Sequence, residues 1–335
     1  MSTEAERAAQ ERATLKAEEQ AKAATSAQLR ADLAVAATIL IAAQLRSSGP
    51  LGLRKLVIDL IGGIVPRAKS MLEVHSIGAR HLGQDQAGAG SRIDPWSMPQ
   101  SERTEELINT SDPRTKARLA EAVELAVALP MNHATDTLAV LAKARSAIQS
   151  QEADAAWVVV RGAALGHHDV AKGQDLNLVW VAERNACLHC LAYQGHVIAP
   201  GGSFPRGLTY GDTPLKPWGL LVGPPLHPHC RCQLELTELQ PGQLDTALAR
   251  EAARSVARGF TDFASEPATY RAADRLVRGV TGLPTVKLPR SVLERTARNL
   301  AAGRFKARPG SVQARAEIAQ RSRDRARRSI TKTLN

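Results

Sequence analysis

Residues 180–195 read WVAERNACLHCLAYQG, and residues 224–232 read PPLHPHCRC. All four cysteines of the 335-residue chain lie in these two stretches, as Cys187-x-x-Cys190 and Cys230-x-Cys232. Between the two pairs, residues 201–229 contain six glycines and six prolines, a composition that excludes a continuous helix and most central strands. A loop this long is uncommon in a compact domain unless it is functional or disordered, so we expect the clustered sulfurs to hold its ends together.

The two cysteine pairs predict a metal site. Two turns that each carry two thiolates can supply the four tetrahedral ligands of a structural zinc ion, and zinc binding would offset the entropy of ordering the loop. A disulfide, four free buried thiols, a low-pKa redox cysteine and a three-ligand catalytic zinc are the alternatives. The predicted cofactor is one structural zinc ion, and its predicted ligands are Cys187, Cys190, Cys230 and Cys232, with His227 and His229 as alternates.

No catalytic residue is predicted. The chain contains no G-x-S-x-G elbow, no Walker A loop, no G-x-G-x-x-G after a strand and no H-E-x-x-H or H-x-E pairing to supply a general base. A cysteine nucleophile with His229 or His196 as its base stays open, but no third group positions that pair. An enzyme, namely a metal-dependent hydrolase or protease that uses the Cys/His cluster, is therefore the alternative to a structural protein.

Composition predicts a soluble, aliphatic, alanine-rich protein, because aromatic residues make up only 3% of the chain. The longest apolar run, residues 33–45, is too short for a membrane span, and the charged segment before it argues against a secretory signal. We therefore expect synthesis in a reducing cytoplasm and no membrane partner. In that compartment, clustered cysteines indicate metal sooner than disulfides.

The first half of the chain predicts helices. Residues 4–30 suggest a solvated helix or frayed arm, and apolar stretches at 29–45, 51–65 and 67–81 predict further helical segments. Turn-forming residues place a loop at 83–101, and Asp112-Pro113 resembles a helix start. That helix should close at Leu129-Pro130, and another, with Leu138, Leu141 and Ile148 on one face, should end near Ser150.

The pattern then changes to short β-branched and aromatic runs. Residues 157–160 and 176–181 predict strands, and His167-His168-Asp169 between them predicts a polar loop. After the cysteines, a four-residue spacing of apolar side chains from Leu244 to Phe260 predicts a helix. The predicted fold class is mainly α, with a small α+β Cys/His module of few short strands and a long Gly/Pro loop in the second half.

The excess of positive over negative charge lies entirely in the last quarter of the chain. Residues 250–335 hold 20 Lys and Arg against 7 Asp and Glu, whereas the first 249 residues hold 24 against 26. Such asymmetry predicts a polyanionic neighbour, with an acidic protein face or a solvated helix as the alternatives to DNA. The residues predicted to contact DNA phosphates non-specifically are Arg304, Lys306, Arg308, Arg315, Arg321, Arg323, Arg325, Arg327, Arg328 and Lys332.

The order Trp180, C-x-x-C, Gly195, a Gly/Pro loop with Phe204, and finally PPLHPHCRC resembles the phage head morphogenesis family. These are the Mu F-like minor capsid proteins of tailed bacteriophages. The resemblance covers roughly residues 157–236. It marks the cysteines and His227 as motif residues together with Trp180, Gly195, Pro224, Pro228 and Arg231.

The resemblance implies a non-enzymatic virion component, made in the host bacterial cytoplasm and located inside the head near the portal. Its implied partners are the portal protein, the major capsid or scaffold protein and the packaged double-stranded DNA. The implied role is in head assembly or in DNA packaging and delivery. The resulting division is a charged helical arm (1–28), a helical portal- or shell-docking region (29–150), the Cys/His module (151–240) and a basic helical tail (241–335).

Overall fold

The computed structural model describes residues 4–45, 49–88, 102–183, 186–209, 219–227 and 230–258. They form two compact units, a helical unit over Glu4–Gly166 and a second unit from His167 onward, which we call the sheet unit. The described residues are mainly helical and contain one three-stranded antiparallel sheet in the second half. The predicted fold class is therefore confirmed.

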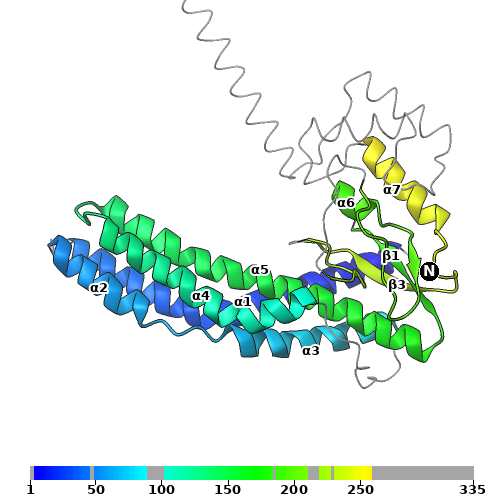
Figure 1. Cartoon of the computed structure of the whole chain (residues 1–335), viewed down its shortest axis with the longest axis horizontal. Helices are drawn as coiled ribbons and strands as arrows, with labels where there is room; N and C mark the ends of the chain where they lie inside the picture. Colours follow the sequence, from blue (N-terminus) through cyan, green and yellow to red (C-terminus); the bar gives the residue numbers. More distant parts are fainter. Residues whose placement is uncertain are drawn as a thin grey trace, which may run out of the picture. The chain divides into compact units, whose positions relative to one another are not determined.

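The helical unit is built from long helices that lie side by side (Figure 1). α1 packs against both α2 and α3, and α4 also packs against both, so two short helices in succession face two long ones. Pro66 lies between the two short helices, where it cannot donate a helical hydrogen bond. The bounds are α1 Glu4–Leu45, α2 Pro50–Gly62, α3 Ala68–Gln86, α4 Glu102–Ala128 and α5 Ala134–Gly173.

Two aliphatic clusters fill the helical unit. The larger one joins α1, α2, α4 and the first half of α5 and includes Leu40, Ile61 and Val140, all fully buried. The smaller one includes Leu72 of α3 and Val158 of α5. The buried side chains are mainly leucine, valine and alanine, which is the aliphatic, alanine-rich core that the low aromatic content predicts. These small side chains let the helices approach closely.

Glycines allow the closest contact, between α3 and α5. A Cβ atom on Gly83 would lie 2.0 Å from the carbonyl oxygen of Ala163, and one on Gly166 would lie 2.1 Å from that of Arg80. Gly162, one turn before Gly166, is similarly covered by Ala79. The two backbones therefore touch here, and no side chain fits between them.

The predicted strand at residues 157–160 is wrong, because this segment lies in the middle of α5. Val158, Val159 and Ala155 are buried and belong to the smaller cluster, so tertiary packing overrides the strand propensity of the valines.

The polar loop predicted at residues 167–169 is also wrong. These residues continue α5 and are buried.

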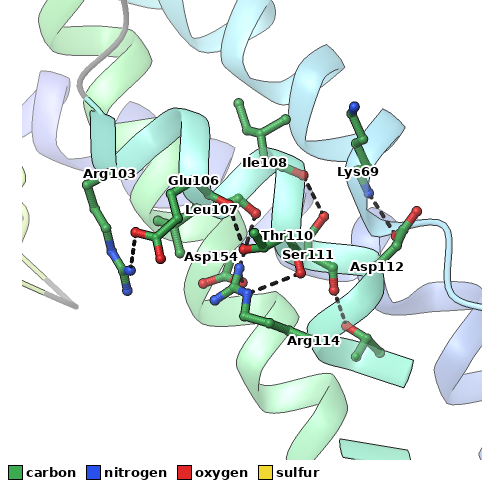
Figure 2. Close-up of polar contacts among 11 residues, drawn as sticks. Lys69, Arg103, Glu106, Leu107, Ile108, Thr110, Ser111, Asp112, Arg114 and Asp154 are labelled. Carbon is green, nitrogen blue, oxygen red and sulfur yellow. Dashed lines mark hydrogen bonds and ion pairs between the residues drawn. The ribbon is translucent and has the colours of Figure 1, made fainter. Parts of the chain in front are cut away.

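The helix start predicted at Asp112-Pro113 is wrong, since both residues lie inside α4 (Figure 2). Pro113 has no N–H to donate to the preceding turn. The guanidinium of the next residue, Arg114, donates to the carbonyls of Thr110 and Leu107 at 3.3 and 3.1 Å and to Asp154 of α5 at 2.7 Å, so this part of α4 is bonded to its own preceding turns and to α5. Asp112 does accept a backbone N–H at a helix start, but the N–H is that of Lys69 in α3.

Three other expectations for the helices need correction. Residues 4–30 form no wholly solvated arm, because Ala21, Ser26 and Leu29 of α1 are buried. The helix expected to end near Ser150 continues to Gly173. Its predicted apolar face is rotated, because Leu138 is exposed while Val140 is buried.

One described helix, α1, is long and apolar enough to cross a membrane by length and composition alone. Three of its leucines, Leu29, Leu33 and Leu40, are buried in the larger aliphatic cluster with α2 and α4. This segment therefore packs one face into the helical unit, whereas its Val35, Ile39 and Ile41 are exposed.

The sheet unit contains β1 Asn177–Val181, α6 Leu188–Leu191, β2 Val197–Ile198, β3 Gln233–Thr237 and α7 Thr246–Arg258, together with the last residues of α5. The strand order is β2-β1-β3 and both pairings are antiparallel. Leu248 of α7 packs on Val179, Val181 and Val197, so α7 covers one face of the sheet. Strand β1 and helix α7 confirm the segments predicted at 176–181 and after Leu244.

Candidate metal centre

Strand β1 is the central strand of the sheet and is buried on both faces from Leu178 to Val181. Its Trp180 is fully buried and packs against Tyr193 and Phe204, with ring centroids 5.1 and 5.2 Å away. These three rings join the strand, the segment after α6 and the first part of the Gly/Pro loop. The sequence singled out Trp180 and Phe204 but missed Tyr193.

Gly195 forms the turn between α6 and β2. Its amide donates to the carbonyl of Trp180 at 2.9 Å, and its carbonyl accepts from Asp245 at 2.7 Å. Its φ of +88° is left-handed, and a Cβ atom would lie 2.6 Å from the carbonyl oxygen of Asp245. Only glycine satisfies both conditions, which explains this motif position physically.

The first cysteine pair lies on a tight turn. Cys187 immediately precedes α6, and its carbonyl accepts the amide of Leu191 at 2.9 Å. Cys190 lies in that short helix, and its carbonyl accepts the amide of Tyr193 at 3.1 Å. One turn of backbone therefore directs both sulfurs to the same side.

The second arm runs from His227 into strand β3. The amide of Cys230 donates to the carbonyl of His227 at 3.1 Å, which closes a turn that carries both side chains. Cys232 directly precedes Gln233, the first residue of β3. Because β3 pairs with β1, the sheet fixes where this arm ends.

The two arms bring five donor atoms into one cluster. The Nε2 atom of His227 lies 3.1 Å from the sulfur of Cys187 and 3.2 Å from that of Cys190, and the sulfurs of Cys190 and Cys230 are 3.6 Å apart. The donors form two groups of three, Cys187, Cys190 and His227 and then Cys190, Cys230 and Cys232, with all atoms of a group within 4.8 Å. The cluster could hold a metal ion.

Burial separates the cluster from water. Each cysteine is at most 3% exposed, and His227 is partly exposed. All four cysteines are free thiols, so the structure contains none of the disulfides that the sequence left open. A buried group of soft sulfur donors with one imidazole is the donor set that zinc prefers.

The four thiols differ in their acidity. The hydrogen bond with Cys190, aided by His227, lowers the pKa of Cys187 to about 4. Burial raises the pKa of Cys190 and of Cys232 well above the ordinary range. Burial opposes ionisation of Cys230 as well, but hydrogen bonds with Cys190 and Cys232 and the charge of His227 hold its pKa well below that range. Sulfurs this close repel one another as thiolates, and a bound cation would relieve that repulsion.

Two further histidines flank the cluster. The Nδ1 atom of His189 lies 2.9 Å from the hydroxyl of Thr209, and burial lowers the pKa of His189 while the thiolate of Cys187 opposes the shift. Burial lowers the pKa of His196 to about 4. Neither histidine belongs to the two donor groups.

His168 forms hydrogen bonds to both halves of the Gly/Pro loop. The sequence predicts this residue in a separate polar loop at residues 167–169. The Nδ1 atom of His168 accepts the amide of Gly201 at 3.1 Å. Its Nε2 atom, which then carries the proton, donates to the carbonyl of Val222 at 2.7 Å. The amide of Phe204 also donates to the carbonyl of Leu221 at 2.8 Å. Neutral imidazole is thus the form that satisfies both bonds.

The remaining predicted residues divide into two sets. Pro224 is buried and precedes Pro225 through a cis peptide bond, and Arg231 lies partly exposed between two cysteines. The others lie outside the described residues, namely His229, Pro228 and all ten basic residues from Arg304 to Lys332. No short motif marks His168, Tyr193 or Asp245, because their roles depend on contacts between distant segments.

No family model, no curated protein and no solved structure matches this chain. The interpretation of the site therefore depends on its own geometry.

Proposed function

We propose that the cluster of four cysteines and His227 binds one structural zinc ion and that this ion fixes the ends of the Gly/Pro loop. The observation that carries the proposal is the convergence of five soft donors from two segments about 40 residues apart in sequence. Ordering such a loop costs conformational entropy, which zinc binding would offset.

The geometry favours an architectural ion over a catalytic one. A catalytic zinc keeps one position open for water or substrate and has a general base nearby. Here the sulfurs are almost fully buried, and the donor groups among the described residues contain no carboxylate. The metal-dependent hydrolase or protease is thus the weaker candidate.

We further propose that the protein is a structural minor head protein of a tailed phage, located inside the head near the portal. The support is that the residues on which the resemblance depends have defined places in the sheet unit: Trp180 lies in its aromatic core, Gly195 forms a turn that only glycine allows, and the cysteines and His227 form the donor cluster. In this proposal the helical unit offers its long surface to the portal, capsid or scaffold protein. Residues 304–332 contact packaged DNA without sequence specificity.

Metal analysis of the full chain, purified under reducing conditions, tests the zinc. We expect about one zinc per chain in the wild type and loss of zinc in Cys190→Ser. His189→Gln is the matched control, because His189 lies in the same turn outside the donor groups and should leave the zinc content unchanged. A metal-free wild type would refute the zinc proposal.

Localisation in purified virions tests the role in the head. An asymmetric reconstruction should place the chain inside the head at the portal vertex, and co-sedimentation should recover it with the portal. Its presence only in the infected-cell lysate, and not in virions, would contradict this role even if zinc is bound.

A truncation after Gly303 tests the tail. It removes all ten predicted phosphate contacts, so we expect DNA affinity to fall and its salt dependence to flatten. The measurement is binding to duplex DNA over a salt series. Equal affinity and slope with and without the tail would refute DNA contact by these residues.

Capsid-protein processing tests the enzyme alternative, a metal-dependent hydrolase or capsid-maturation protease. The test uses phage that carry His229→Gln or Cys187→Ser and still assemble heads. The structural proposal expects normal processing of the capsid protein in these phage. A processing defect with normal incorporation of the variant would favour the protease.

A further inference from the structure

We infer that His227 is a direct ligand of the ion and that Cys232 is not, so the site is Cys187, Cys190, His227 and Cys230. This inference deepens the proposed zinc function and depends on it. It changes the ligand set that the sequence alone favours, in which the four cysteines bind and histidine is an alternate.

The first argument is the backbone spacing of the ligands. Cys187 and Cys190 are separated by two residues on a turn, and His227 and Cys230 are separated by two residues on a turn closed by a 3.1 Å hydrogen bond. Each turn directs two donors into the cluster. Two such x-x turns carry the four donors of a Cys₃His site, and Cys190, which belongs to both donor groups, joins them. Binding of one ion then draws Cys230 toward the group of Cys187, Cys190 and His227, within which it does not lie in this structure.

The second argument is the distances between donors. Ligands about 2.3 Å from zinc for sulfur and 2.0–2.1 Å for nitrogen lie about 3.5–3.8 Å apart in a tetrahedron. The sulfurs of Cys190 and Cys230 are 3.6 Å apart, and Nε2 of His227 is 3.1 and 3.2 Å from two sulfurs. One imidazole nitrogen has a single proton or lone pair, so a hydrogen bond satisfies only one of these sulfurs. A shared ion would use both contacts at once, and binding it would move Nε2 a few tenths of an ångström away from the two sulfurs, to the tetrahedral separation of about 3.5 Å.

Cys232 is then an outer-sphere thiol. It lies within 4.8 Å of Cys190 and Cys230, where its S–H can donate to a ligand sulfur. It also directly precedes β3, so the pairing of that strand with β1 fixes its backbone. Such a donor orients ligands without occupying a coordination position.

The experiment replaces zinc with Co²⁺ in the reduced full-length protein. Thiolate-to-cobalt charge-transfer absorption increases with the number of thiolate ligands, so a Cys₃His site and a Cys₄ site give different intensities. We expect three thiolates in the wild type and three in Cys232→Ala. An intensity that indicates four thiolates in the wild type would overturn the assignment while leaving the zinc proposal intact.

Zinc competition with a chromophoric chelator gives a second readout. His227→Ala and Cys230→Ala should each weaken zinc binding by more than about 100-fold, and Cys232→Ala by about 10-fold, as expected of an outer-shell residue. An equal loss for Cys230→Ala and Cys232→Ala, or no larger loss for His227→Ala than for His189→Ala, would overturn the inference. Absence of Co²⁺ and Zn²⁺ binding in the wild type would overturn both this inference and the zinc proposal.

Discussion

The two units of this protein achieve order by different means. The helical unit buries aliphatic side chains of long helices in two clusters, with leucines, valines and alanines along its length. The sheet unit has only a short β2 and two five-residue strands, and its aliphatic cluster on the α7 face is small. Its order depends instead on particular groups: the aromatic trio, Gly195, His168 and the sulfur cluster.

This contrast teaches where each unit is vulnerable. Stability in the helical unit is distributed over many similar contacts, so single aliphatic substitutions act locally and in proportion to the volume removed. In the sheet unit, a few groups each hold segments that are distant in sequence. We therefore expect large, concentrated effects there when one such group is lost.

The largest effect is expected from metal removal. Chelation of a reduced, zinc-loaded protein should withdraw a contribution on the order of 10 kcal/mol from the sheet unit, the scale found for structural zinc sites. Hydrogen exchange should then become fast in residues 187–198 and 230–237. Protection in α2 and α4 of the helical unit should stay unchanged, so hydrogen exchange by segment is the measurement.

The matched variant for this experiment is Cys190→Ser, since Cys190 belongs to both donor groups. It should reproduce the effect of the chelator, and further chelator should then have no effect. Uniform loss of protection across both units would break the comparison, because it would show that the helical unit also depends on the cluster.

The second largest effect is expected at the close contact between α3 and α5 of the helical unit. Gly83→Ala places a Cβ atom 2.0 Å from the backbone of Ala163, so α3 and α5 must separate at a cost of about 3 kcal/mol or more. Gly78→Ala is the control, because nothing lies within 4 Å of its Cβ atom and alanine is the better helix former. It should be neutral or stabilise by up to about 1 kcal/mol, measured by hydrogen exchange in α3. Equal behaviour of the two variants would contradict the close contact.

How far the sequence alone predicts this fold depends on the range of the signal. Pro130 ends the helix before it, and the short run of β-branched and aromatic residues at 176–181 predicts β1, because both signals act locally. The valines of residues 157–160 mislead, since their environment in α5 is set by helices 40 to 140 residues away. Pro113 misleads as well, because it lies inside α4, in a stretch where Arg114 bonds to Asp154 of α5.

The candidate site shows the same limit. Spacing predicted that the two cysteine pairs meet, and the structure brings them together. Sequence spacing alone does not choose between His227 and Cys232, because the choice proposed above also needs the hydrogen bond that closes the turn from His227 to Cys230, which only the fold shows. His168 was assigned to a loop, and only the fold shows it between Gly201 and Val222.

The third effect concerns the Gly195 turn of the sheet unit. Gly195→Ala combines a left-handed backbone with a Cβ atom 2.6 Å from the carbonyl of Asp245, for an expected loss of about 2–3 kcal/mol. Gly242→Ala shares the positive φ of +82° but has open space, so it should cost only about 1 kcal/mol. Chelator titration monitored by zinc release is the measurement, and Gly195→Ala should release zinc at the lower chelator concentration. The reverse order would show that the turn does not support the cluster.

The smallest effect is a pH dependence in the helical unit. Burial raises the pKa of Asp154 above its ordinary 3.8, although Arg114 opposes the shift. The native state therefore binds this proton at a pH where the unfolded chain has released it, so stability rises as pH falls through the folded pKa toward 3.8. Asp154→Asn should remove that rise and change stability at pH 7 by less than about 1.5 kcal/mol.

Glu121 provides the control of opposite sign for Asp154. Its hydrogen bond and charge interaction with Lys143 lower its pKa below the ordinary 4.5, so its contribution is present above pH 4.5 and is lost as pH falls through the folded pKa. Urea unfolding of the helical unit between pH 3 and pH 7 should show the rise on acidification flattened in Asp154→Asn. The rise in stability on acidification should be steeper in Glu121→Gln, because this variant lacks the loss of stability that protonation of Glu121 causes in the wild type. If both variants shift the profile in one direction, the partly buried Arg114–Asp154 pair behaves like a surface ion pair. This pair would then contribute little to the helical unit, and the contrast with the concentrated contacts of the sheet unit would be sharper.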